Sequence, residues 1–163
     1  MTGSKETAAE VLKWCGRRRW SLSVAESCTG GLVGGCLTAV PGSSAVFIGG
    51  VIAYSNAAKE RLLGVPPEIL HLRGAVSEET AIAMARGVAK ILGSQCGVSV
   101  TGVAGPGGGT REKPVGTVWF GAVSPRKELS RLGRFDGSRD HVREQSVQAA
   151  LELVLELVGP EKR

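Results

Sequence analysis

Aromatic residues are scarce in this chain, and only 4% of its 163 residues are of this kind. The net charge of +5 and the run Arg17-Arg18-Arg19 could indicate nucleic-acid binding. No basic segment, however, is interleaved with the aromatic side chains that stack on bases. We therefore interpret the arginine run as a solvated basic face after the first helix and expect no nucleic-acid partner. The net positive charge of the chain fits a small anionic substrate instead.

Paired metal ligands are missing as well. The four cysteines form no C-x-x-C pair, and the two histidines, His71 and His141, are far apart in the sequence. This pattern argues against a zinc site and favours buried free thiols. We expect neither a metal nor a cofactor.

Long apolar segments are also absent. No run approaches the ~18–20 residues of a membrane span, and an N-terminus with Lys5, Glu6 and Glu10 lacks the form of a signal peptide. We expect a cytoplasmic protein with no membrane partner. A chain of this length buries roughly 70% of its unfolded surface, which is enough for a single domain over residues 1–163.

Helical and strand patterns alternate along the chain. The apolar periodicity predicts helices at about 5–15, 32–40, 56–63, 77–92 and 139–158, and strands at 22–25, 46–54, 97–101, 116–123 and 128–135. The Gly49-Gly50 pair in the second strand predicts a bulge or a close approach of the backbone. Together the elements predict an α/β fold, a three-layer α/β/α single domain around a mixed β-sheet.

The segment Ala25-Glu26-Ser27-Cys28-Thr29-Gly30-Gly31 forms a hydroxyl-rich turn between a predicted strand and a predicted helix. The first N–H groups of a helix are unpaired, and with the helix dipole they suit a phosphate or a developing oxyanion. Ser27 stands where a nucleophilic hydroxyl would be presented, although Ser27 or Thr29 could simply cap the helix. Cys28 is the alternative nucleophile, because a helix N-terminus lowers the pKa of a thiol.

A second loop, residues 102–109, contains five glycines in eight residues. It matches neither the Walker pattern nor the dinucleotide fingerprint and could be a plain flexible loop. The loop leaves the carboxyl end of a strand, and ligands of open α/β sheets bind in the crevice at those ends. Ser27 is expected in the same crevice, so two glycine-rich strand exits converge there.

Six ordered segments resemble the CinA C-terminal domain family, over about Ala9 to Leu157. They are the turn already quoted, Pro41-Gly42-Ser43-Ser44, Tyr54-Ser55-Asn56-Ala57-Ala58-Lys59, Gly74-Ala75-Val76-Ser77, Thr101-Gly102-Val103-Ala104-Gly105-Pro106 and Lys113-Pro114-Val115-Gly116-Thr117-Val118. The characterised members of the family are nicotinamide-nucleotide amidases, which hydrolyse nicotinamide mononucleotide to nicotinate mononucleotide and ammonia. Some carry an additional N-terminal domain, for which this chain has no room, so it resembles the stand-alone type.

The resemblance implies Ser27 as the nucleophile, Lys59 as its base and Tyr54 nearby. It also implies at least a homodimer, with nicotinamide mononucleotide as the small-molecule partner. The residues expected to bind the substrate are Thr29, Gly30, Gly31, Thr101, Gly102, Gly105, Arg139 and Arg143.

The chemistry of a lysine base constrains how the substrate lies. A lysine pKa near 10.4 leaves only about 1 molecule in 2,500 neutral at pH 7, and full neutrality needs a shift of roughly 3 units, about 4 kcal/mol. Burial and nearby cations supply such shifts. A phosphate against Lys59 would have the opposite effect, so we expect the phosphate on backbone N–H groups or on an arginine such as Arg143. Arg139 and Arg143 are four residues apart and share one helix face, which is expected to look into the crevice.

Several roles remain open at this level. The N–H groups around Thr29 to Gly31 could hold the oxyanion. Tyr54 could relay a proton to ammonia, or could stack on or orient the pyridine ring. Glu26 could cap the helix or contact the ribose. The alternative function is a non-catalytic nucleotide-binding module linked to competence or DNA damage, and the intact base position argues for the enzyme.

Overall fold

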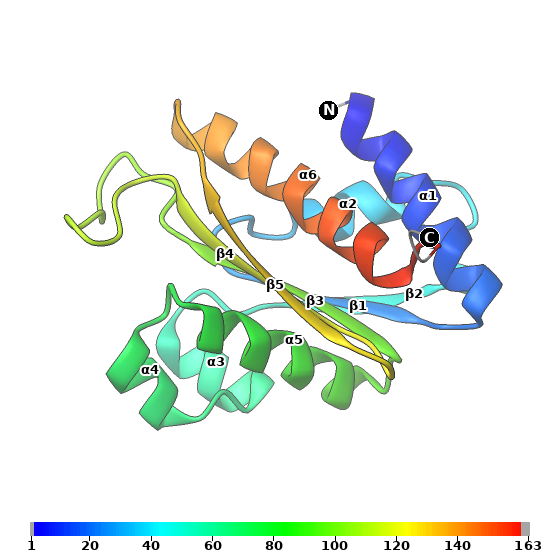
Figure 1. Cartoon of the computed structure of the whole chain (residues 1–163), viewed down its shortest axis with the longest axis horizontal. Coiled ribbons are helices and arrows are strands. Elements are labelled where there is room, and N and C mark those ends of the chain that lie inside the picture. Colours follow the sequence, from blue (N-terminus) through cyan, green and yellow to red (C-terminus); the bar gives the residue numbers. More distant parts are fainter. Residues whose placement is uncertain (1, 161–163) are drawn as a thin grey trace.

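A mixed five-stranded sheet with the order β2-β1-β3-β4-β5 runs through the molecule, and the computed structural model describes residues 2–160 (Figure 1). The strands are β1 (Leu22–Glu26), β2 (Phe47–Ile52), β3 (Cys96–Gly102), β4 (Thr117–Val123) and β5 (Glu128–Arg134). β1 pairs in parallel with both β2 and β3, whereas β4 and β5 are added antiparallel. The carboxyl ends of the three parallel strands therefore meet at one end of the sheet.

Helices cover both faces of this sheet (Figure 1). α1 (Thr2–Arg18), α2 (Leu32–Thr38) and α6 (Arg139–Val158) lie on one face, and α3 (Asn56–Leu63), α4 (Pro67–Arg73) and α5 (Glu78–Leu92) lie on the other. A short 3-10 turn, Ser43–Ala45, precedes β2. The predicted three-layer α/β/α fold is thereby confirmed. No helix within residues 2–160 has both the length and the apolar character needed to cross a membrane.

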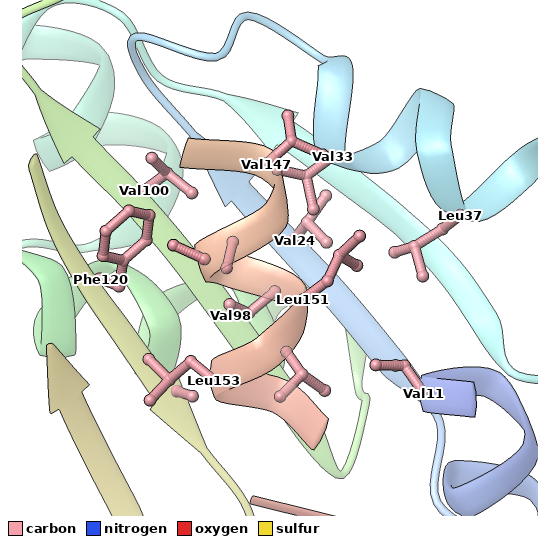
Figure 2. Close-up of a cluster of buried hydrophobic side chains, with 14 of the residues drawn as sticks. Val11, Val24, Val33, Leu37, Val98, Val100, Phe120, Val147, Leu151 and Leu153 are labelled. Carbon is pink, nitrogen blue, oxygen red and sulfur yellow. The ribbon is translucent and has the colours of Figure 1, made fainter. Parts of the chain in front are cut away.

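The larger core lies under α6, as Figure 2 shows. Val147, Leu151 and Leu153 of α6 pack in one cluster with side chains from the central strands, among them Val98 and Phe120. Full burial of one such side chain stabilises the fold by about 1.5–3 kcal/mol. This packing fixes the position of α6 on the sheet, and the N-terminal end of α6 reaches the carboxyl ends of the parallel strands.

The bulge expected at the glycine pair of β2 is confirmed. The register against β1 shifts between Leu22 and Ser23. A Cβ at Gly50 would lie 2.5 Å from Val24 Cγ2, so only glycine fits this close approach.

Three local expectations need correction. α4 was not predicted, because Gly64 and the Pro66-Pro67 pair were interpreted as the end of a helix only. They do end α3, but Pro67 then opens a new helix at a position where a missing N–H costs nothing. β2 ends at Ile52, two residues earlier than predicted. The arginine run does not follow the first helix, because α1 continues to Arg18, and Arg18 is only half-exposed, with its guanidinium donating to Val158 O at 2.5 Å and Gly159 O at 2.8 Å.

The cysteines are free thiols, as expected. Cys15, Cys28 and Cys96 are buried, and Cys36 is half-buried.

Candidate active site

A small cavity of about 190 Å³ opens at the carboxyl ends of the parallel strands. Its lining comes from segments far apart in the sequence, and it consists of Ser27, Cys28, Tyr54, Lys59, Ala75, Val76, Thr101, Gly102, Ala104 and Arg139. Five predicted site residues beyond the nucleophile turn are thus brought together with Ser27. They are Tyr54, Lys59, Thr101, Gly102 and Arg139.

Ser27 is the first residue after β1 and is almost completely buried, with 7% of its surface exposed. Its N–H donates to Val100 O of β3 at 2.9 Å, which continues the sheet pairing one residue beyond the strand. Its carbonyl accepts from Gly30 N–H at 3.1 Å and closes a tight turn. The chain therefore turns sharply at Ser27 and presents the hydroxyl at the cavity.

Glu26 caps the helix that follows, which settles the alternative left open by the sequence. Its buried carboxylate accepts from the backbone N–H groups of Gly31, Val33 and Gly34 at 2.9–3.1 Å. The helix N-terminus predicted as an anion site is thus already occupied by an anion of the chain itself.

Lys59 reaches the nucleophile from the opposite face of the sheet. It lies on α3, whose N-cap is Ser55, and it is 1% exposed. Its Nζ lies 3.1 Å from Ser27 Oγ, 3.0 Å from Ala53 O and 3.1 Å from Tyr54 O. The two carbonyl groups stand at the end of β2, so the edge strand fixes the amine.

The three contacts can be made by either form of the amine, and an ammonium would donate to all three oxygen atoms. A neutral –NH₂ group has two hydrogens and one lone pair, so it can donate to both carbonyl groups and accept the proton of Ser27. Burial lowers the pKa of Lys59, and the negative charge of a Cys28 thiolate would oppose this shift. Among residues 2–160, no carboxylate lies within salt-bridge distance of the amine. The structure therefore places the predicted nucleophile, Ser27, in contact with a lysine whose pKa is lowered.

Tyr54 and Arg139 contribute the polar groups that reach solvent. Tyr54 is 62% exposed, and its hydroxyl accepts from Arg139 Nη2 at 3.2 Å. Arg139 is the exposed first residue of α6, and its Nη1 also donates to Gly105 O at 2.7 Å. This guanidinium is anchored to the glycine loop yet remains available to a ligand at the cavity.

Thr101 and its neighbours form the inner wall. The Thr101 hydroxyl donates to Ala75 O at 2.7 Å, which joins β3 to the loop before α5. Ala75, Val76 and Ala104 were not predicted as site residues, because small apolar side chains carry no chemical signal. Two of the resemblance segments do contain them, and that was the available clue.

Five of the predicted substrate-binding residues do not line the cavity, and they are Thr29, Gly30, Gly31, Gly105 and Arg143. Thr29 is fully buried, and its hydroxyl has no hydrogen-bond partner among the described residues. The N–H groups of Gly30 and Gly31 are already used, by Ser27 O and Glu26. Gly105 contributes only its carbonyl, which Arg139 holds.

Arg143 contacts the nucleophile turn. Its Nε donates to Cys28 O at 3.1 Å and its Nη2 to Thr29 O at 3.3 Å. The shared helix face of Arg139 and Arg143 does look toward the site, as predicted, but the two side chains contact different loops.

The expectation that Cys28 has a lowered pKa is wrong. Burial raises the pKa of Cys28 to about 11, because desolvation outweighs the hydrogen bond and the nearby cations that favour the thiolate. The helix cannot compensate, since α2 begins only at Leu32 and its first N–H groups are held by Glu26. At pH 7 only about one Cys28 in 10,000 would be ionised.

The comparisons with known proteins identify the family. The model of the CinA C-terminal domain matches residues 4–158, and this chain belongs to that family. A CinA-like protein of Gemmatimonas aurantiaca is 49% identical over 151 residues, which cover 92% of this chain and 35% of that protein. A CinA-like protein of Synechococcus sp. is 53% identical over 150 residues, which cover 90% and 36%.

A crystal structure of the competence/damage inducible protein CihA from Agrobacterium tumefaciens is 41% identical to this chain. It superposes with a TM-score of 0.92 and covers 95% of both chains. This chain spans about a third of the length of the two curated relatives described above.

Proposed function

We propose that this protein is a nicotinamide-nucleotide amidase that uses Ser27 as its nucleophile and Lys59 as the base. The observation that carries the proposal is the contact of 3.1 Å between Lys59 Nζ and Ser27 Oγ, made by a lysine that is 1% exposed. A buried amine that contacts a serine hydroxyl is the arrangement that a serine–lysine hydrolase requires. The family resemblance supplies the substrate.

In the first half of the reaction, Lys59 takes the proton of Ser27 and Ser27 Oγ attacks the carboxamide carbon. The carbonyl oxygen becomes an oxyanion. The N–H of the residue after a nucleophile is a common oxyanion donor, and within residues 2–160 Cys28 N–H donates to no backbone carbonyl group. The intermediate collapses as the carbon–nitrogen bond breaks. The leaving nitrogen takes the proton from Lys59 and departs as ammonia.

In the second half, a water molecule attacks the ester on Ser27 while Lys59 accepts its proton. The ester bond breaks, Ser27 Oγ recovers the proton, and nicotinate mononucleotide leaves. Ser27 and Lys59 regain their starting protonation states, because the serine proton leaves with ammonia and water supplies its replacement, so neither step requires a metal ion or a redox cofactor.

The size of the cavity supports a pose in which only part of the substrate lies inside it. Pockets for drug-sized ligands measure roughly 300–1,000 Å³, and the 190 Å³ here suits the pyridine carboxamide alone. The ribose and phosphate would then lie outside, near Arg139. This guanidinium stands at the N-terminus of a 20-residue helix, where the helix dipole also favours an anion.

The proposal is tested by ammonia release from nicotinamide mononucleotide in the presence of EDTA. The wild-type protein is expected to be active. Ser27→Ala is expected to bind the nucleotide and to lose activity by about 10⁴-fold or more. Lys59→Ala is expected to lower turnover by about 10²–10⁴-fold. Absence of ammonia release by the wild-type protein would overturn the proposal and favour the nucleotide-binding module.

Cys28 provides the matched control for the nucleophile. With its pKa raised to about 11, it is expected to be dispensable, so Cys28→Ala retains activity within a few-fold. An inactive Cys28→Ala together with an active Ser27→Ala would assign the nucleophile to the thiol.

A further inference from the structure

The turn that carries Ser27 is held between two side chains of opposite charge that approach it from different elements. Glu26, on its N-terminal side, holds three N–H groups at the start of α2. Arg143, on α6, holds the carbonyl groups of Cys28 and Thr29. Since the carboxylate binds N–H groups of this segment and the guanidinium binds its carbonyl groups, the short segment between β1 and α2 is fixed at both ends. Arg143 Nη1 also lies 3.8 Å from Asp140 Oδ1 on its own helix.

We propose that Arg143 is a positioning residue for the nucleophile and does not bind the substrate phosphate. This inference rests on the proposed amidase function. Arg143 acts from outside the cavity, because Arg139 is among the cavity-lining residues and Arg143 is not. It is only partly exposed, with 28% of its side-chain surface accessible.

The route from Arg143 to Ser27 passes through one peptide unit. Arg143 Nη2 donates to Thr29 O, and in a trans peptide the N–H that follows points the opposite way. That N–H belongs to Gly30 and donates to Ser27 O at 3.1 Å. The peptide group between Thr29 and Gly30 is therefore bound by Arg143 at its carbonyl oxygen, and its N–H binds the carbonyl oxygen of Ser27.

The second carbonyl bond has a different consequence. Arg143 Nε donates to Cys28 O, which fixes the direction of the Thr29 N–H on the opposite side of that peptide. Thr29 N–H has no acceptor within residues 2–160. Arg143 donates to the two carbonyl groups from two different nitrogen atoms of a rigid planar fork, whereas a lysine would have to donate from a single atom on a flexible stem.

The first test compares the two arginines kinetically on nicotinamide mononucleotide. Arg143→Ala is expected to lower kcat by about 10–100-fold with KM changed less than about twofold, since a displacement of the order of 1 Å costs about 10²-fold. Arg139→Ala is expected to raise KM. A raised KM with unchanged kcat in Arg143→Ala would make Arg143 a substrate ligand and overturn the inference.

Chemical rescue separates positioning from general loss of structure. Methylguanidinium added to Arg143→Ala is expected to restore part of kcat, and Arg143→Lys is expected to recover less than the added guanidinium does. Glu144→Ala, at the adjacent exposed position of α6, is the control and should match the wild-type protein. Arg143→Gln, which keeps one N–H donor, replaces the alanine variant if circular dichroism shows that Arg143→Ala does not fold.

A second readout does not depend on the substrate. Labelling of Ser27 by a fluorophosphonate reports the reactivity of the hydroxyl, and Arg143→Ala is expected to label at least about 10-fold slower than Glu144→Ala. Labelling of wild-type protein that releases no ammonia would overturn the amidase and leave the positioning role standing. Equal labelling of both variants would overturn the positioning role, and a wild-type protein that neither labels nor releases ammonia would overturn both.

Discussion

The hydroxyl of Tyr54 accepts a hydrogen bond from Arg139 at 3.2 Å, which joins the segment after β2 to the first residue of α6. Both side chains line the cavity, and both are exposed. In the proposed mechanism Lys59, which contacts Ser27 Oγ at 3.1 Å, moves the proton, so the phenol is not needed for that step. Tyr54 is therefore expected to orient Arg139 and the pyridine ring.

Tyr54→Phe tests this role. The variant keeps the ring and loses the bond to Arg139, so we expect KM to rise and kcat to fall by no more than a few-fold. Steady-state kinetics on nicotinamide mononucleotide provide the measurement, with Tyr54→Ala as the variant that also lacks the ring. A loss of kcat by about 10²-fold in Tyr54→Phe, the size of a general-acid contribution, would instead assign the proton relay to the phenol.

The lowered pKa of Lys59 predicts how activity depends on pH. Only the neutral amine can accept the proton of Ser27, so kcat/KM should rise with pH through the pKa of Lys59 in the free protein. Burial places that pKa below the ordinary lysine value of about 10.4. The rising limb is therefore expected below pH 10.4, and a limb at or above that value would show that the amine stays charged.

The same shift makes stability depend on pH. Below the folded pKa of Lys59, the fold carries the full penalty of a buried ammonium. As pH rises from the folded pKa toward about 10.4, the unfolded chain binds more protons and the penalty fades. Lys59→Met should therefore gain most over the wild-type protein at low pH, and the gain should shrink by at most about 1.4 kcal/mol per pH unit.

Urea unfolding at several pH values measures this difference. Lys90→Met, at an exposed position of α5, is the matched control for replacing a lysine by methionine. A constant difference for Lys59→Met would contradict the lowered pKa.

A glycine of α5 controls the approach of the helix that carries Lys59. A Cβ at Gly87 would lie 1.9 Å from Leu63 O of α3, so the two helices would have to separate. Gly87→Ala is expected to lower the free energy of unfolding by about 3 kcal/mol and to reduce activity as Lys59 moves. Gly35→Ala, on α2, meets nothing within 4 Å and should be neutral or stabilising by up to about 1 kcal/mol. Thermal and urea unfolding of the two variants provide the comparison.

The two edges of the sheet differ in a way that predicts self-association. β5 carries charged residues, including Glu128, Arg131 and Arg134, which discourage pairing with another chain. β2 carries none over residues 47–52, and its Ile48 and Ile52 are each 54% exposed. We therefore propose that the dimer implied by the family resemblance forms through β2.

Sedimentation equilibrium tests this surface. Ile48→Lys is expected to yield monomers with unchanged circular dichroism. Ile91→Lys, at a position of α5 that is 53% exposed, should leave the association state unchanged. A dimer that survives Ile48→Lys, or a wild-type protein that is monomeric at every concentration, would contradict the proposal.

Much of the fold could be predicted because each element carries its own local signal. Apolar periodicity located the helices and strands, and the carboxyl-end rule brought the turn at Ser27 and the glycine loop to one crevice. The contact between Ser27 and Lys59 could not be predicted locally, since the two residues are 32 positions apart and α2, the 3-10 turn and β2 lie between them. On spacing alone, Lys59 reads as a surface lysine, and only the family resemblance indicated a base.

What the sequence could not predict are the partners of charged side chains. Arg143 was expected to face a ligand and Glu26 was open between a helix cap and a ribose contact, and both are used by the backbone around the nucleophile. Cys28 was misjudged for a related reason, because its burial depends on packing between segments that are distant in the chain. The sequence shows which side chains are charged, whereas the hydrogen-bond and ion-pair partners of those side chains depend on the folded structure.

If the cavity holds only the amide-bearing ring, as proposed, then cleavage of the amide and recognition of the rest of the nucleotide depend on different parts of the protein. In this pose free nicotinamide could also reach Ser27, because the ribose and the phosphate lie outside the cavity. Preference for the nucleotide would then depend only on how strongly its ribose and phosphate bind outside the cavity, near Arg139. Substitutions around Arg139 would accordingly change which pyridine amides are hydrolysed and would leave Ser27 and Lys59 unchanged.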